Sequence, residues 1–355
     1  MFAKLLRDER SRRNMSLKSL SKHTDIDASL LSRFENGQRM PTKEQLGKLS
    51  NELGFSDHQL LKAWLVDKVY DVLDDYPDVA SEVLHAMESR VEYLSGPKAL
   101  NLDKVPDFIK QELVEIDMLK AKWRDAKPVK GVQFEKLNEA FGMDYTFESN
   151  RIEGNTLTLQ ETFLVIKEGL TISGKSIQEH LEAINHDDAI DFIRDLAKNK
   201  TPINEYGLKQ LHNLVLKGID RRNAGVYRSV GVRIGGSQHV PPEPFLIQKM
   251  MEDYFVHYTA QVDKMHPVLL AAEMHERLVS IHPFIDGNGR TSRLIMNLIL
   301  LRNGYTLAIL KGDNASRMAY YKALEDVQIN NDPIPFYTLI CKLVKESLIS
   351  HLKLA

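Results

Sequence analysis

The sequence has little that would suit an oxidising or a membrane environment. Its 355 residues include one cysteine, Cys341, so no disulfide can form within the chain, which is typical of a reducing compartment. No stretch approaches the ~20 apolar residues of a membrane-spanning helix, and the first ten residues contain no apolar signal segment. We therefore expect a cytoplasmic protein that does not interact with a membrane.

Neither sign of charge dominates the chain as a whole. It has 47 Lys and Arg against 49 Asp and Glu, a formal net charge of −2, and 43% hydrophobic residues, as in an ordinary globular protein. The charge is uneven, because residues 1–43 contain ten Lys/Arg and five Asp/Glu, a net +5, which leaves −7 for the rest. A basic segment on an otherwise acidic chain suggests that this segment binds a polyanion.

Residues 1–56 have the pattern of short helices separated by tight turns. Ser16 and Asp27 are suited to cap helices over 17–24 and 28–36, and the short gap between these helices is typical of a helix-turn-helix. The run Leu-Leu-Ser-Arg-Phe-Glu-Asn-Gly-Gln-Arg-Met-Pro-Thr at 30–42 resembles the phage-repressor (Xre-type) DNA-binding domain. A helical protein-interaction module with the same scaffold is the alternative. The resemblance implies DNA contacts by Lys18, Ser29, Ser32, Arg33 and Arg39.

The rest of the chain is predicted to be helical apart from one interval. Residues 57–99 are interpreted as a helical connector, whose apolar stripe would pack in a core or in a homodimer contact. Gly96-Pro97 interrupts the helical pattern, so a second domain is expected over residues 100–355. Within it, residues 231–242 alternate, contain glycines and end in two prolines, which predicts a small β-hairpin that serves as a flap. The predicted fold class is therefore all-α with one hairpin. The helices of the second domain are expected over 105–125, 133–147, 158–169, 176–198, 204–217, 246–260, 267–281, 289–303, 314–328 and 333–352.

Residues 282–293, His-Pro-Phe-Ile-Asp-Gly-Asn-Gly-Arg-Thr-Ser-Arg, concentrate polar chemistry between two predicted helices. The glycines stand where the second helix begins, where free backbone N–H groups and the helix dipole favour an anion. Arg290 and Arg293 can neutralise phosphate charge from the first turn of that helix. His282 is the residue type expected of a general base, and Asp286 is an oxygen ligand suited to Mg²⁺. A phosphate-rich ligand is predicted here.

Two other common motifs do not fit the chain. His275-Glu276 begins a zinc-protease motif, but Val279 stands where its second histidine would be needed. The spacing from Gly169 to Ser176 matches a phosphate-binding P-loop, but it follows a predicted helix and not a strand. We interpret that match as chance.

The loop resembles the signature of the Fic family of adenylyltransferases, His-x-Phe-x-Asp/Glu-Gly-Asn-Gly-Arg-x-x-Arg, and every signature position is present. The resemblance implies transfer of AMP from ATP to a Ser, Thr or Tyr hydroxyl of a target protein, which could be this chain itself. It implies that His282 deprotonates the hydroxyl, that Asp286 holds Mg²⁺, and that Arg290 and Arg293 bind the outer phosphates. The other nucleotide-binding residues that it implies are Gly236, Ser237, Gln238 and His239 of the flap, Gly287, Asn288, Gly289, Thr291 and Ser292 of the loop, and Tyr320, Tyr321 and Gln328 of a later helix. Gln328 departs from the family pattern, which has an asparagine there.

A second short motif lies upstream, Ser-Asn-Arg-Ile-Glu-Gly-Asn at 149–155. It resembles the inhibitory motif of the Fic family, Ser/Thr-x-x-x-Glu-Gly/Asn, and implies that Glu153 pairs with Arg293 and takes it from the γ-phosphate. The simpler interpretation is an exposed acid near a helix end. A charge-assisted hydrogen bond contributes ~1.5–3 kcal/mol, which corresponds to roughly 10–150-fold inhibition.

The sequence therefore favours an adenylyltransferase inhibited by Glu153 and joined to a DNA-binding domain. Two alternatives stay open. The protein could be a transcriptional regulator whose second domain senses nucleotide, or the same site could remove AMP from modified proteins, with Glu153 orienting a water. Because repressor-type domains usually bind paired half-sites, a homodimer is the modest expectation.

Overall fold

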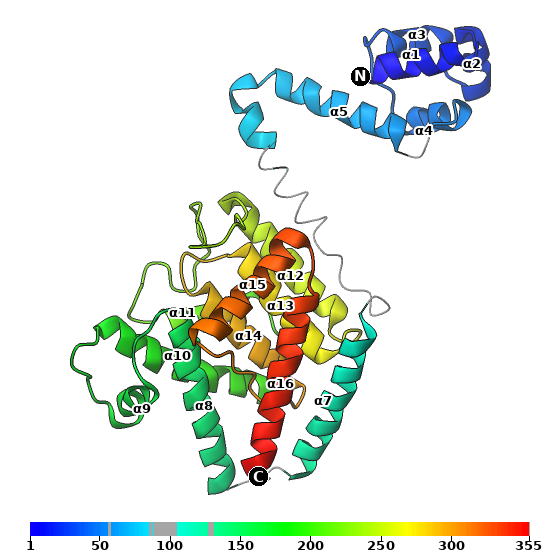
Figure 1. Ribbon diagram of the computed structural model, residues 1–355. Coiled ribbons are helices and arrows are strands. Elements are labelled where there is room, and N and C mark those ends of the chain that lie inside the picture. Colours follow the sequence, from blue (N-terminus) through cyan, green and yellow to red (C-terminus); the bar gives the residue numbers. More distant parts are fainter. Residues whose placement is uncertain (56–57, 85–86, 88–104, 127–130, 355) are drawn as a thin grey trace. The chain divides into compact units, whose positions relative to one another are not determined.

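The computed structural model describes residues 1–55, 58–84, 87, 105–126 and 131–354 (Figure 1). The chain divides into two compact units, Met1–Glu88 and Ser89–Ala355. Within the described ranges the secondary structure is helical and no strand occurs. None of the helices found there is both long and apolar enough to cross a membrane. The predicted joint at Gly96-Pro97 and the predicted domain start near residue 100 lie outside the described residues.

The first unit has the helical order that the sequence predicts. Ser16 accepts a hydrogen bond from the Ser19 N–H (3.1 Å) and Asp27 accepts one from the Ser29 N–H (2.8 Å), so both expected N-caps are confirmed. Helices α2 and α3 pack together, while α5 packs against α1 and α4. Its helices are α1 (Phe2–Arg12), α2 (Leu17–Thr24), α3 (Ala28–Glu35), α4 (Lys43–Glu52) and α5 (Gln59–Asp74), and residues 77–84 are also helical.

The second unit is built around helix α14 (Asn288–Arg302). Its residues from Asn288 to Leu300 are almost all buried, as expected for a helix at the centre of a core. Helices α10, α11 and α13 pack against it, and α7 lies along α16 (Figure 1). The other helices are α7 (Asp107–Ala126), α8 (Val132–Ile152), α9 (Leu159–Glu168), α10 (Ile177–Lys198), α11 (Glu205–Val215), α12 (Ile247–Gln261), α13 (Pro267–Ile281), α15 (Asn314–Asn330) and α16 (Ile334–Leu354). Each begins within a few residues of its predicted start.

Helix α8 continues beyond its predicted end at residue 147 as far as Ile152. Ser and Asn are poor residues for a helix interior, but here tertiary contacts hold them. The Asn150 side chain donates to the carbonyl of Glu182 (3.1 Å), and Ser149 accepts from Arg293. The extension makes Glu153 the C-cap of α8 and fixes where its carboxylate can reach.

The predicted β-hairpin at 231–242 is wrong. The turn itself forms, since the Ser237 N–H donates to the Ile234 carbonyl (3.2 Å) and Gly236 has a φ of 76°. The two arms, however, are not paired as strands within this described segment. Pro241 and Pro242 have no N–H to donate to a ladder, which disfavours strand pairing at that arm. The flap is therefore an extended loop with a tight turn.

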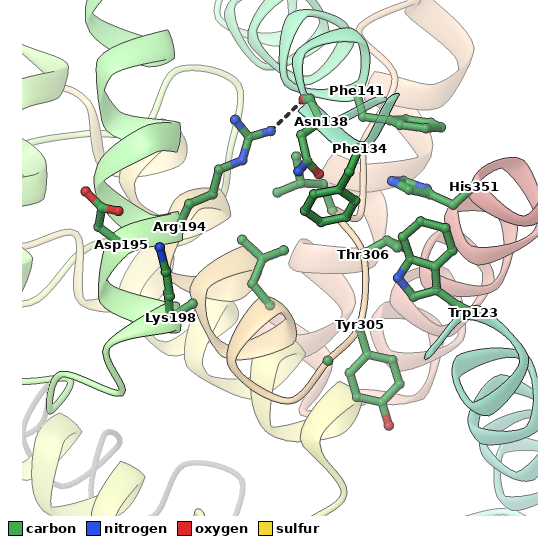
Figure 2. A pocket seen from close by; sticks show the side chains of 14 residues that line it. Trp123, Phe134, Asn138, Phe141, Arg194, Asp195, Lys198, Tyr305, Thr306 and His351 are labelled. Atoms are coloured by element: carbon green, nitrogen blue, oxygen red, sulfur yellow. Dashed lines mark hydrogen bonds between the residues drawn. The ribbon is translucent and has the colours of Figure 1, made fainter. Parts of the chain in front are cut away.

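A cavity of about 440 Å³, shown in Figure 2, is lined in part by residues at and just after the C-terminal end of α14. Phe141, Arg194, Tyr305 and His351 are among its lining residues. Leu301, near the C-terminal end of α14, also lines it. Because a helix rises about 1.5 Å per residue, Leu301 is roughly 20 Å from the helix start. This cavity is separate from the site described next.

Candidate active site

His282 is held at the end of α13 in a single tautomer. It is the C-cap of the helix and adopts a left-handed conformation, φ 49° and ψ 57°, which is uncommon for residues other than glycine. Its Nδ1–H donates to the Val279 carbonyl (3.2 Å), so Nε2 is the proton-accepting nitrogen. Burial, helped by the charges of Arg228 and His239, lowers the pKa of His282 to about 4. The imidazole is therefore neutral at pH 7, as a general base must be.

The loop between His282 and α14 is closed by its own side chains. Asn288 accepts from the Phe284 N–H (3.0 Å) and donates to the Phe284 carbonyl (2.9 Å). The Phe284 ring is fully buried and stacks on His212 at 3.6 Å between ring centroids. His212 Nε2–H in turn donates to the Asp286 carbonyl (2.8 Å), while its Nδ1 accepts from the Gly225 N–H (2.8 Å). The loop shape is thus fixed from both sides.

Arg290 is nearly fully buried between two acids. Its Nη2 lies 3.3 Å from Asp286, and its Nη1 lies 3.3 Å from Glu182. Glu182 also accepts a hydrogen bond from Asn155 (2.9 Å), two residues after Glu153. The Nε and Nη1 atoms of Arg290 are buried without a hydrogen-bond partner among the described residues. Buried donors of this kind favour an additional acceptor.

Arg293 is the most fully paired residue of the loop. Its Nη2 donates to the Glu153 carboxylate (2.7 Å) and to the Ser149 carbonyl (3.0 Å), and its Nε donates to Ser149 Oγ (3.0 Å). Burial is the largest single influence and opposes the charged form, but Glu153, Tyr320 and Tyr145 together outweigh it and raise the pKa of Arg293 above the usual value. A Cβ atom on Gly289 would meet Glu153 Oε1 at 2.5 Å. The carboxylate therefore lies over the first turn of α14, where an anion would bind.

The flap and the later helix meet at the end of α13. His239 Nε2–H donates to the Ser280 carbonyl (2.9 Å), and the Gln328 amide donates to Ser280 Oγ (3.0 Å). Tyr320 is buried and bonded to His275 (3.1 Å), whereas Tyr321 is 42% exposed and reaches the Ile152 carbonyl (3.4 Å). Of the two tyrosines, Tyr321 is the one with a face open to a ligand.

The remaining predicted nucleotide-binding residues divide by exposure. Gly236 and Gln238 are exposed at the flap turn, and Ser237 accepts there from the His239 N–H (3.1 Å). Thr291 and Ser292 are fully buried, and Ser292 donates to the Asn288 carbonyl (2.6 Å). The Ser292 hydroxyl therefore supports the loop from the core side, whereas the buried Thr291 hydroxyl has no hydrogen-bond partner among the described residues.

Three residues near the loop were not predicted from the sequence. His212 stands on an apolar helix face, where a lone histidine is usually a core residue. Glu182 is one of several acids along α10, and Arg228 precedes the flap outside any motif. No local pattern marks them, because each acts on an element distant in sequence.

The residues present fit a Mg²⁺ ion held mainly by a nucleotide. The Asp286 side chain is 58% exposed, so its carboxylate is accessible. No group of three or more His, Cys, Asp or Glu side chains suited to a metal occurs among the described residues. One carboxylate with phosphates and waters is a common arrangement for Mg²⁺.

In the first unit, the predicted DNA contacts lie on or beside helices α2 and α3. Lys18, Ser29, Arg33 and Arg39 are exposed, and Ser32 is partly buried. Helix α3 is joined to α1 by the bidentate pair of Arg10 with the buried Glu35 (2.6 and 2.8 Å).

Known domain families match part of each unit. Residues 202–300 match the Fic/DOC family, and residues 3–69 match a helix-turn-helix domain. The chain contains a Fic domain. The protein adenylyltransferase Fic of Drosophila grimshawi is 37% identical over 206 residues, which are 58% of this chain and 41% of that protein. The protein of the same name from Nematostella vectensis is 34% identical over 220 residues, 61% of this chain and 50% of that protein. The chain thus spans about half or less of these relatives.

Solved structures agree with the fold. A Fic domain containing signaling protein from Bacteroides thetaiotaomicron superposes with a TM-score of 0.62 and 28% identity, over 68% of this chain and 96% of that one. Fic-1 from C. elegans superposes with a TM-score of 0.63 over 95% of this chain and 96% of that one. At 24% identity, the second likeness concerns the fold alone.

Proposed function

We propose that the Fic domain transfers AMP from ATP to a hydroxyl side chain of a protein. The observation that carries the proposal is that a neutral His282, with Nε2 as acceptor, lies in the same loop as the start of α14 and its two buried arginines. Relatives named protein adenylyltransferase Fic support this reaction class.

The chemistry balances at these groups. The target hydroxyl oxygen attacks the α-phosphorus of ATP, and His282 Nε2 takes its proton. The new P–O bond forms as the bond to the β-phosphate oxygen breaks, and pyrophosphate leaves. Asp286 would hold a Mg²⁺ whose charge offsets that of the phosphates. The N–H groups at the start of α14, together with Arg290, would stabilise the phosphates in place.

The domain is proposed to be inhibited by Glu153. Its carboxylate pairs with Arg293 at 2.7 Å and lies over Gly289, so it competes with a triphosphate for the same arginine and the same helix start. Repulsion between two anions would misalign the nucleotide for attack. Removing the carboxylate should therefore activate the enzyme.

The first unit is proposed to bind DNA through α2 and α3. Its helix-turn-helix match and the exposed Lys18, Arg33 and Arg39 support this. Arg33→Ala should weaken binding to a cognate operator, found by selecting bound fragments of genomic DNA, by about 1–3 kcal/mol. Arg221→Ala, a change of the same type at an exposed arginine of the other unit, should leave binding unchanged.

The reaction is tested with Glu153→Gly protein, a cell lysate, and ATP labelled at either the α- or the γ-phosphate. We expect a protein band labelled from the α-phosphate alone. Label from the γ-phosphate would indicate phosphate transfer, and the absence of both labels would overturn the proposal. A band at the mass of the chain itself would identify it as its own substrate.

A further inference from the structure

Arg228 joins the catalytic loop to both ends of the flap. Its Nε donates to the His282 carbonyl (2.7 Å), its Nη1 to the Val230 carbonyl (3.0 Å), and its Nη2 to the Pro242 carbonyl (2.5 Å). Its backbone N–H donates to the Pro283 carbonyl (2.9 Å). The residue is only 3% exposed. The buried guanidinium therefore contacts the catalytic residue and the two ends of the flap, and the Arg228 backbone contacts the residue after His282.

An arginine is suited to this position and a lysine is not. The guanidinium is planar and carries its donors in a fixed fork, so it can bond three carbonyls that lie in different directions. Here the three carbonyls belong to segments 40 or more residues apart or to opposite ends of the flap. Because those ends are not paired as strands within the described segment, Arg228 supplies a connection that a hairpin ladder would otherwise provide.

The residue that Arg228 contacts in the catalytic loop, His282, has an uncommon backbone conformation. The left-handed conformation of His282 turns its carbonyl out of the α13 helix, and that carbonyl is the one that Arg228 bonds. A side chain held in an uncommon backbone conformation keeps its direction only when its surroundings determine it. The Arg228 bond is one such determinant, and the Val279 bond to the imidazole is another.

We propose that Arg228 is a positioning residue that fixes His282 and the flap as one unit, so that the base and the target-facing segment keep their relative geometry. The inference rests on the proposed AMP transfer for its kinetic consequences, but not for its structural ones. It predicts two separable roles. The fork of donors holds the geometry, and the positive charge helps to keep His282 neutral.

The test compares Arg228→Lys and Arg228→Met in the full chain carrying Glu153→Gly. Both variants lose the fork, so we expect kcat for AMP transfer to fall by about 10²-fold, the effect of a small misplacement of a catalytic group. KM for ATP should stay within about twofold, since Arg228 contacts only protein carbonyls in this structure. The sequence from 229 to 248 has one trypsin site, Arg233, so cleavage there measures release of the flap. It should be faster in both variants.

The effect of the Arg228 charge on His282 is measured from the pH dependence of the rate of AMP transfer. The charged groups acting on His282 are Arg228 and His239, which lower its pKa, and Glu153, which raises it and is absent in this background. Arg228→Met should therefore move the acid limb of the rate profile, and the NMR titration of His282, to higher pH. Arg228→Lys keeps the charge and should leave both in place. A purely structural role would move neither.

The matched control is Arg302→Met. Arg302 also bonds backbone carbonyls, those of Thr201 (2.9 Å) and Lys200 (2.7 Å), but at the far end of α14. It should lower thermal stability without changing flap cleavage, kcat or the titration. Unchanged kcat and unchanged cleavage at Arg233 in Arg228→Lys would overturn the inference. If the Glu153→Gly parent transfers no AMP, the proposed function fails, while cleavage and the His282 titration still decide the role of Arg228.

Discussion

Helices α10 and α14 both begin with backbone N–H groups that lack a partner within the helix. The polar group that lies near these N–H groups comes from a different part of the chain in each case. At α10, Ser176 accepts from the Glu179 N–H (3.1 Å) and Glu179 bonds back to the Ser176 N–H (2.8 Å), which is a complete capping box. At α14 the N-cap is Gly287, which has no side chain to offer. The carboxylate near that start comes instead from Glu153, which is distant in sequence.

The difference separates a structural helix start from a functional one. A local cap is bound permanently, because its residue is part of the same turn. A carboxylate brought from another helix can leave, and it then exposes N–H groups and arginines that suit a phosphate. An anion site that is filled by a removable internal acid is thus a regulated site.

The largest effect is expected from removing the base beside the α14 start. In protein carrying Glu153→Gly, His282→Ala should lower the rate of AMP transfer by about 10²–10⁴-fold, since a positioned base contributes that much. ATP affinity, measured by calorimetry, should change little because the phosphate-binding groups remain. AMP incorporation retained at the parent rate would remove His282 from the mechanism.

The second test removes the acid from the α14 start in one variant and a local helix cap in another. Glu153→Gly should raise AMP transfer by roughly 10–150-fold, the equivalent of the ~1.5–3 kcal/mol of a charge-assisted bond. Thr42→Ala removes a local capping box, that of α4, and should only lower the stability of the first unit by about 1 kcal/mol. Both are measured as initial rates and thermal melts. Equal rates for wild type and Glu153→Gly would show that the carboxylate does not inhibit.

The same contrast explains what the sequence could predict. Local caps such as Ser16 and Asp27 bond N–H groups no more than three residues away, so the sequence alone indicates them, and the helices that they begin are confirmed. The loop at 282–293 is also local, so its position between two helices was predictable. The contacts of Glu182, His212 and Arg228 join elements far apart along the chain. The spacing of residues in the sequence does not predict such contacts. The prediction of a hairpin at 231–242 was wrong for a related reason. Alternation of apolar and polar residues indicates a strand only where a partner strand exists.

A third prediction concerns pH and follows from the burial of His282. A base must be unprotonated to act, so transfer falls as the pH drops through its pKa. With the pKa lowered to about 4, about 90% of His282 is neutral at pH 5, against about 3% for an ordinary histidine. The rate of Glu153→Gly protein at pH 5 should therefore lie within about twofold of its value at pH 7. A fall of about 25-fold would mean that the site is solvated and the pKa ordinary.

The smallest expected effect lies at the second acid of the α14 start. Glu182 lies 3.3 Å from Arg290 and stays fixed by Asn155, so it offsets part of the charge that would attract a triphosphate. Glu182→Gln keeps the shape and removes that charge, and it should tighten ATP binding by about fivefold, equivalent to about 1 kcal/mol. Asp191→Asn is the control on the same helix, because this exposed acid is paired with Arg194 and should not affect the nucleotide. Weaker ATP binding in Glu182→Gln would mean that Glu182 mainly orients Arg290 and does not oppose the binding of a triphosphate.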